Sequence, residues 1–170
     1  LMVGLLFKIG AAPFHQWTPD VYQGSPTSIT GFMAACTKVA AFGALLRVMY
    51  VALGGIRWDW RPMMYVIAAL TMIVGTLFAL TQTDMKRLLA YSSIENIGLI
   101  AVGIGLTLIF HAYRMEALAA LAMTAVLYHC LAHAGFKSLL FLCTGSVLHA
   151  TRERSLGKLG GLIHRMPWVA

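Results

Sequence analysis

A series of long apolar runs constrains what this chain can fold into. Each run holds about 20 or more mostly apolar residues, the length that a helix needs to cross the hydrocarbon core of a bilayer. The runs cover approximately residues 26–50, 62–81, 87–110 and 117–148. Hydrophobic residues make up 59% of the chain and charged residues 11%, whereas soluble domains average about 45–50% and about 25%. The sequence therefore predicts an all-α integral membrane protein and excludes a soluble globular domain.

The residues before the first of these runs predict an interrupted helix. Pro13 follows an apolar segment; it has no N–H to pair with the carbonyl of Ile9, and its ring would collide with that carbonyl. We expect Lys8 to lie beside the backbone acceptor that this helix break at Pro13 leaves free. Residues 1–24 are thus predicted to form one discontinuous helix, which gives about five transmembrane helices in all, followed by a loop over 149–170.

Charged side chains fall near the middle of several predicted spans. Lys38, Glu95 and Lys137 each lie about nine or more residues from the nearest helix end, or about 13 Å at about 1.5 Å per residue. Placing such a group in lipid costs about 2.5–3.5 kcal/mol on insertion scales, so each must face protein or water. By default, ionisable groups at this depth mark a pathway for ions or protons. Glu95 is expected either to act as the counter-ion of a lysine or to pair helices.

A row of titratable residues recurs at intervals of four in the last run. His129, His133 and Lys137 would line one face of a helix over about 12 Å. Three such groups, each reachable from the next directly or through one water, indicate a proton relay. The alternative is that they bridge helices and hold the bundle together. The histidine spacing also suits a metal pair, but no third ligand is placed to complete a metal site, so we expect none.

Little other chemistry is visible in the sequence. There is no P-loop and no glycine-rich dinucleotide motif, so we expect no catalytic residue, no cofactor-binding residue and no cofactor. The net charge of +7 comes from basic residues scattered at the ends of the apolar runs, as in many membrane proteins, and predicts no nucleic-acid partner. Because the chain begins inside an apolar run, we expect a piece of a longer protein.

Several stretches resemble a known family of membrane subunits. FKIGAAPFHQWTPDVYQGSPT, the mid-helix pair Thr37 and Lys38, and TQTDMKRLLAYSSI closely resemble the antiporter-like subunits of bacterial respiratory complex I, with the N subunit as the best match. SIENIGLI and LYHCLAHAGFKSLLFLCTGSVLHATRERSLGKLGGLIHRMPW look more like hydrogenase-4 component B and the formate hydrogenlyase membrane subunit. The L subunit and the large Mrp antiporter subunit are related too.

The resemblance implies an antiporter-like fold in which residues 1–170 form one partial proton-antiporter membrane domain. It matches Lys8 to the lysine of a broken helix, Lys38 to the lysine of the next helix, and Lys137 with His129 and His133 to a central connecting relay. It implies proton translocation across the cell inner (plasma) membrane, in a redox-driven complex of the NADH:quinone oxidoreductase type, with other membrane subunits as partners. A hydrogenase-4 or formate hydrogenlyase membrane arm and an Mrp-type cation/proton antiporter are the alternatives.

Overall fold

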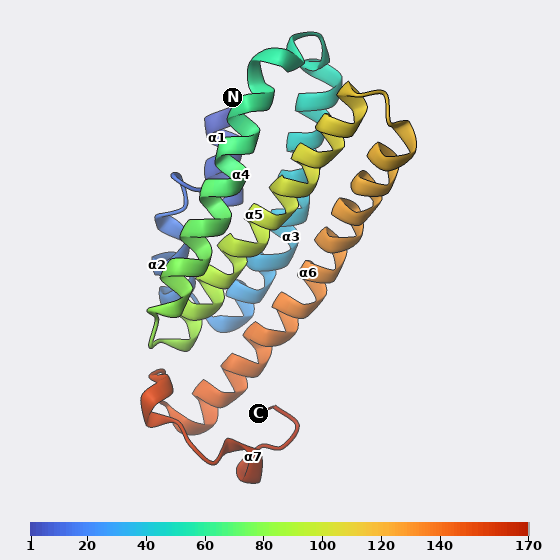
Figure 1. The fold of residues 1–170 in the computed structure, drawn as a ribbon. Helices are drawn as coiled ribbons and strands as arrows, with labels where there is room; N and C mark the ends of the chain where they lie inside the picture. Colours follow the sequence, from blue (N-terminus) through green and yellow to red (C-terminus); the bar gives the residue numbers. More distant parts are fainter. Residues whose placement is uncertain (170) are drawn as a thin grey trace.

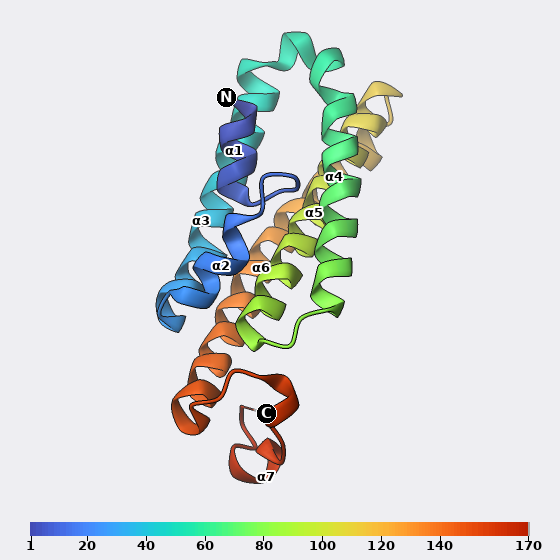
Figure 2. The ribbon, with the colours of Figure 1, turned by 90° about the vertical axis from the view of Figure 1, so that its left-hand side faces the viewer.

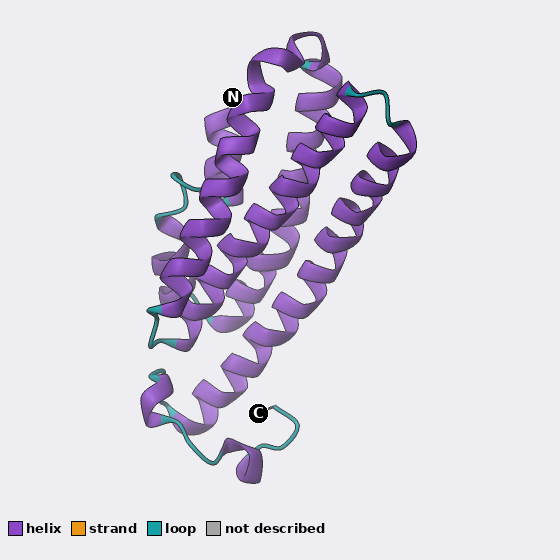
Figure 3. Cartoon of the chain, viewed as in Figure 1, coloured by secondary structure: helices purple, strands orange, loops and turns teal. Residues whose placement is uncertain are grey.

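The computed structural model describes residues 1–169, and residues 56–59 by their backbone alone. Helices make up nearly all of this part of the chain, and the only β pairing described is an isolated bridge between Asp84 and Ser155 (Figure 3). The long helices are α3 (Thr27–Arg47), α4 (Arg57–Leu80), α5 (Met85–Ala112) and α6 (Glu116–Thr151). A π-helical segment, η1 (Val48–Ala52), continues α3, and a short turn, η2 (Gly54–Ile56), leads into α4.

Among the described residues, four helices are long and apolar enough to cross a membrane, which confirms the predicted all-α membrane fold. These candidate spans are Thr27–Ala52, Trp60–Leu80, Met85–Ala112 and Glu116–Thr151. They lie side by side, with α5 packed between α4 and α6, and α3 packed on α6 (Figure 1). The predicted loop over 149–170 is shorter than expected, because α6 continues to Thr151 and the tail contains η3 (Leu156–Lys158) and α7 (Leu162–Arg165).

The predicted discontinuous helix is present as two short helices beside α3. These are α1 (Met2–Ile9) and α2 (Trp17–Gly24), which follow one another along the bundle with an irregular connection between them (Figure 2). With 8 residues each, neither is long enough to span the bilayer alone. The break begins before the predicted position: α1 ends at Ile9, and Pro13 lies inside the connection.

Gly10 explains why α1 stops where it does. Its backbone is left-handed, with φ at 83°. The amide of Gly10 donates to the carbonyl of Phe7 at 3.0 Å, and that of Ala11 donates to the carbonyl of Leu6 at 3.0 Å. This is the hydrogen-bond pattern of a glycine-terminated helix, and it satisfies two of the carbonyls that every helix end leaves free.

Helices α4 and α5 pack closely, and their backbones touch at two glycines. A Cβ atom on Gly98 would lie 2.7 Å from Cα of Met72, and one on Gly75 would lie 2.7 Å from Cα of Glu95. Small residues permit this approach, which is a common way for membrane helices to pack. The contact fixes α5 against α4 on one side, so that the polar residues near Glu95 can meet α6 on another.

A polar network ties α2 to the start of α5. Asp84 caps α5 by accepting the backbone N–H groups of Lys86 and Arg87 at 2.8 and 3.1 Å. Arg87 forms an ion pair with Asp20 of α2 at 2.9 Å. The buried Nζ of Lys86 donates to the carbonyl of Ser25 at 2.6 Å, at the end of α2. The second half of the broken helix is therefore held by α5.

Candidate functional site

Lys38 reaches the break in the first helix from the middle of α3. Its side chain is only 2% exposed, and Nζ donates to the carbonyl of Ile9, the last residue of α1. The ammonium also lies 5.2 Å from the ring centroid of Trp17 and 5.9 Å from that of Tyr22, both on α2. Lys38 thus contacts both halves of the broken helix. The sequence prediction placed Lys8 beside the freed carbonyl of Ile9, but Lys38 is the lysine that binds it.

Two buried threonines complete the surroundings of the break. The amide of Ala12 donates to Oγ1 of Thr71 on α4 at 3.0 Å. A Cβ atom on Gly10 would lie 2.7 Å from Oγ1 of Thr18 and 3.1 Å from Nζ of Lys38, so only glycine leaves room here. Oγ1 of Thr18 is buried and has no hydrogen-bond partner among the described residues. A hydroxyl and a lysine amine therefore both lie against Gly10.

Lys8 lies in the last turn of α1, on its exposed side. Its charge nevertheless acts on the amine of Lys38. Of the two lysines of the opening segment, only Lys38 is buried. Pro13, the predicted break, is also exposed and makes no contact with either lysine side chain among the described interactions.

The second group of predicted residues lies where α6 faces α5. Lys137 is 1% exposed, and its Nζ donates to Oγ of Ser92 at 2.8 Å. Glu95, one turn further along α5, is close enough for its charge to act on Lys137. Nε2 of the half-buried His129 lies 3.1 Å from Oδ1 of Asn96, also on α5. The predicted face of α6 therefore meets a polar face of α5 built from Ser92, Glu95 and Asn96.

His133 lies between His129 and Lys137 on α6, and it is close enough to Lys38 on α3 for their charges to interact. It is 2% exposed, and both Lys137 on its own helix and Lys38 on α3 act on it electrostatically. Its ring centroid lies 6.4 Å from that of His129, and its Nε2 is buried with no hydrogen-bond partner among the described residues. Within this part of the chain no direct hydrogen bond joins His129, His133 and Lys137, so a proton would need water or side-chain movement to pass between them.

Sequence reasoning did not identify Thr18, Thr71 or Ser92. A signal was available for two of them: Thr71 is a hydroxyl in an otherwise apolar run, and Ser92 precedes Asn96 by four residues and so shares its helix face. In the described part of the chain, no group of three or more His, Cys, Asp or Glu side chains could hold a metal ion.

Comparison with known proteins identifies the family. The family model described as "NADH:quinone oxidoreductase/Mrp antiporter, TM" matches residues 1–170. The chain belongs to this family. It is 50% identical, over 177 aligned positions, to NADH-quinone oxidoreductase subunit N 3 of Streptomyces griseus subsp. griseus, an alignment that covers 100% of this chain and 29% of that protein. The similarity to subunit N therefore includes the second half, where the sequence looked more like hydrogenase-4 component B.

Solved structures of the family have the same fold. The chain superposes on a chain of respiratory complex I from Thermus thermophilus with bound Aureothin with a TM-score of 0.71 and 36% identity, covering 99% of this chain and 34% of that chain. For the Mrp complex from Dietzia sp. DQ12-45-1b, the TM-score is 0.83 at 25% identity, covering 97% of this chain and 29% of that chain. The chain spans less than a third of the length of the curated relatives that it matches. It is a multi-pass membrane protein with an antiporter-like fold and a homologue of complex I subunit N.

Proposed function

We propose that this chain translocates protons across the bacterial inner membrane as part of an N-type subunit of a redox-driven NADH:quinone oxidoreductase complex. Other membrane subunits of that complex are its partners, and the redox energy comes from partner subunits rather than from this chain. The observation that carries the proposal is the burial of Lys38, His133 and Lys137 within membrane spans. Membrane helices rarely retain such costly groups unless they serve a pathway.

The proposed route begins at the break and continues along α6. Lys38 takes up a proton next to Ile9, with Lys8 as its neighbour toward the exposed side. The proton then passes through His133 to Lys137, where Glu95 supplies the compensating charge. His129, bound to Asn96, extends the same face.

Repulsion between like charges gives this route a driving mechanism. Lys8 acts on Lys38, and both Lys38 and Lys137 act on His133. Two neighbouring groups cannot both carry a proton at low cost, because like charges in a low-dielectric interior repel strongly. When a proton arrives at one group, the neighbouring group therefore tends to release its own proton. A local change of charge in this way moves protons along the row.

The proposal is tested in the full complex with Lys38→Ala and Lys137→Ala. Inverted membrane vesicles are energised with NADH, and acidification is followed with a quenched dye alongside quinone reduction. Both variants should pump fewer protons per NADH than the wild type while the complex remains assembled. Lys158→Ala is the matched control, since Lys158 is an exposed lysine of the tail. Undiminished pumping in both buried-lysine variants would refute the relay.

The structural similarity to the Mrp complex supports a second candidate, a cation/proton antiporter. An antiporter exchanges ions along existing gradients and needs no redox donor. Vesicles that hold the full protein would then show sodium-dependent proton movement in the absence of NADH. Proton movement that requires NADH and is indifferent to sodium would favour the redox-driven function instead.

A further inference from the structure

The side chain of Asn96 is held in one orientation by its own helix. Its Nδ2 donates to the backbone carbonyl of Ser92, one turn back on α5, at 2.8 Å. A carbonyl oxygen only accepts, so the amide nitrogen of Asn96 must face Ser92. The amide oxygen therefore faces α6, where Nε2 of His129 lies 3.1 Å from it.

This orientation decides which nitrogen of His129 carries a hydrogen. An amide oxygen has no hydrogen to donate, so the bond exists only if Nε2 of His129 is an N–H. The same holds for the neutral ring and for the imidazolium cation. In a neutral ring with its hydrogen on Nδ1, lone pairs of Nε2 and Oδ1 would face each other and the bond would be lost. Nδ1 is thus the nitrogen at which His129 can gain and release a proton.

The remaining surroundings of His129 leave the bond to Asn96 unopposed. No other hydrogen bond reaches the ring of His129 among the described residues. The ring also lines a cavity of about 350 Å³ between α5 and α6, whose other walls are apolar or aromatic side chains. His133, one turn along α6, differs, because its Nε2 is buried and has no partner in the described part of the chain. A neighbour fixes the hydrogen at Nε2 of His129 but not at Nε2 of His133.

We infer that Asn96 is a positioning residue that confines the proton exchange of His129 to Nδ1. A proton that binds Nδ1 of the neutral ring makes an imidazolium, and the Nδ1–H bond breaks again when the proton leaves. The hydrogen on Nε2 stays bound to Asn96 throughout. His129 therefore ends the row on α6, because a proton cannot enter at one nitrogen and leave from the other. This role in the row rests on the proposed function.

Solid-state NMR of the full complex, with isotope-labelled histidine nitrogens, tests the assignment. Spectra are recorded in alkaline buffer, where free histidine is neutral, and the signals of His129 are those missing from His129→Gln. In the wild type the hydrogen should be on Nε2. Asn96→Leu, which has no acceptor, should raise the ratio of Nδ1–H to Nε2–H rings about 2- to 12-fold, as expected for the loss of one hydrogen bond. Asn96→Asp keeps an acceptor oxygen and should return the hydrogen to Nε2.

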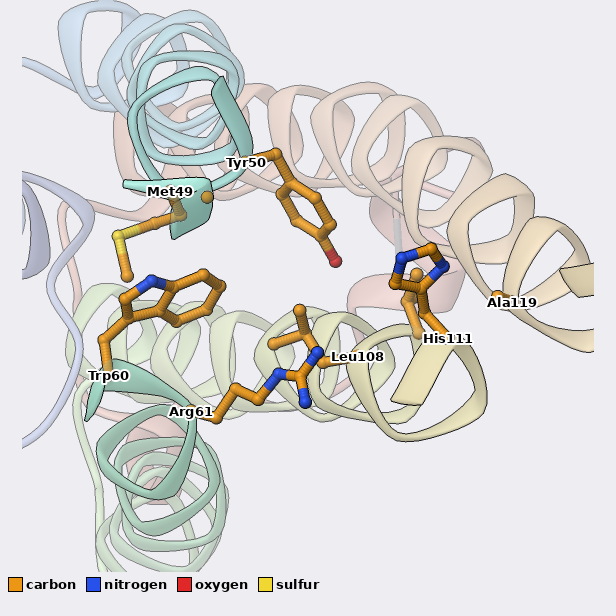
Figure 4. Close-up of a pocket in the computed structure, with 9 residues that line it drawn as sticks. Met49, Tyr50, Trp60, Arg61, Leu108, His111 and Ala119 are labelled. Atoms are coloured by element: carbon orange, nitrogen blue, oxygen red, sulfur yellow. The ribbon is translucent and has the colours of Figure 1, made fainter. Parts of the chain in front are cut away.

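His111 is an internal reference for these spectra. It lies near the end of α5, where it lines a cavity with Met49, Tyr50 and Trp60 (Figure 4). Its Nδ1 lies 3.1 Å from Oε2 of Glu116, and an ionised carboxylate only accepts, so here the hydrogen is on Nδ1. The signals of His111 should be the same in every Asn96 variant.

Ser93→Ala is the matched control for Asn96→Leu. It removes a bond of 2.8 Å from another buried side chain of α5 to a carbonyl of the same helix, that of Leu89. It should change neither the His129 spectrum nor the number of protons pumped per NADH, whereas Asn96→Leu should lower that number.

Two outcomes would overturn the inference, and both differ from failure of the proposed function. A wild-type His129 with its hydrogen on Nδ1, or a ratio unchanged in Asn96→Leu, would refute the assignment whatever the complex pumps. If the ratio shifted but Asn96→Leu pumped as Ser93→Ala does, Asn96 would position a ring that the route does not use. The proposed function itself is decided separately, by pumping in Lys38→Ala and Lys137→Ala.

Discussion

Replacing Thr71 by valine removes a buried hydrogen-bond acceptor without changing the shape of the side chain. Thr71 is 0% exposed, and its Oγ1 accepts the amide of Ala12 at 3.0 Å. This bond joins α4 to the connection between α1 and α2, so it is expected to hold the break in place. Valine has a helix propensity close to that of threonine, and α4 itself should therefore be little affected.

The size of the effect follows from the group that is left behind. A buried amide that loses its partner costs about 1–3 kcal/mol. This cost lowers the free energy needed to open the connection between α1 and α2 locally. The population of molecules in which the connection is open therefore rises about 5- to 150-fold. Hydrogen exchange of the purified complex, followed by mass spectrometry on peptides covering residues 10–16, should accelerate by that factor in Thr71→Val and return toward the wild-type rate in Thr71→Ser.

Thr76→Val is the matched control for Thr71→Val. It makes the same change five residues further along α4, at an exposed hydroxyl that donates to the carbonyl of Met72 in its own helix at 2.9 Å. Exchange in residues 10–16 should not respond to it. If Thr71→Val left that exchange unchanged, or if Thr76→Val raised it equally, the bond between Thr71 and Ala12 would not be what holds the break.

Two further predictions concern packing and pH. Gly98→Ala should destabilise the protein by about 1–3 kcal/mol, because the new methyl group would lie 2.7 Å from Cα of Met72. Gly135→Ala should not, because no neighbour lies within 4 Å of that position. The unfolding temperatures of the purified complexes measure both effects. The backbone N–H groups of Ser155 and Arg154 hold the pKa of Glu153 below its ordinary value of 4.5. Its carboxylate therefore stabilises the folded tail above about pH 4.5, and this contribution is lost as the pH falls through the lowered pKa. In the wild type, the rate at which an acid-active protease cleaves the tail should rise as the pH falls through the lowered pKa of Glu153. A cleavage rate that does not change with pH, or an equal rise in Glu153→Gln, would contradict this.

The spans were predictable because lipid imposes a simple requirement of length and hydropathy on each run. The end of α1 could not be predicted from the sequence, because Gly10 adopts a left-handed conformation that glycine permits but does not require. Contacts between helices were harder still to predict, because the partners are far apart in the sequence. Lys38 and Ile9 are separated by 29 residues, and Lys137 and Ser92 by 45. Spacing alone predicted that His133 and Lys137 share a face, but not which residues of α5 meet it.

The bond from Lys38 to the end of α1 has a chemical consequence. The carbonyls at the C-terminus of a helix carry a partial negative charge, so the end of α1 stabilises an ammonium much as a counter-ion would. A carboxylate in that position could take the proton from the lysine and keep it, but a peptide carbonyl is far too weak a base to do so. A neutral amine still has two N–H groups, so Lys38 can hold Ile9 whether or not it is charged. The backbone partner therefore steadies the lysine without competing for its proton.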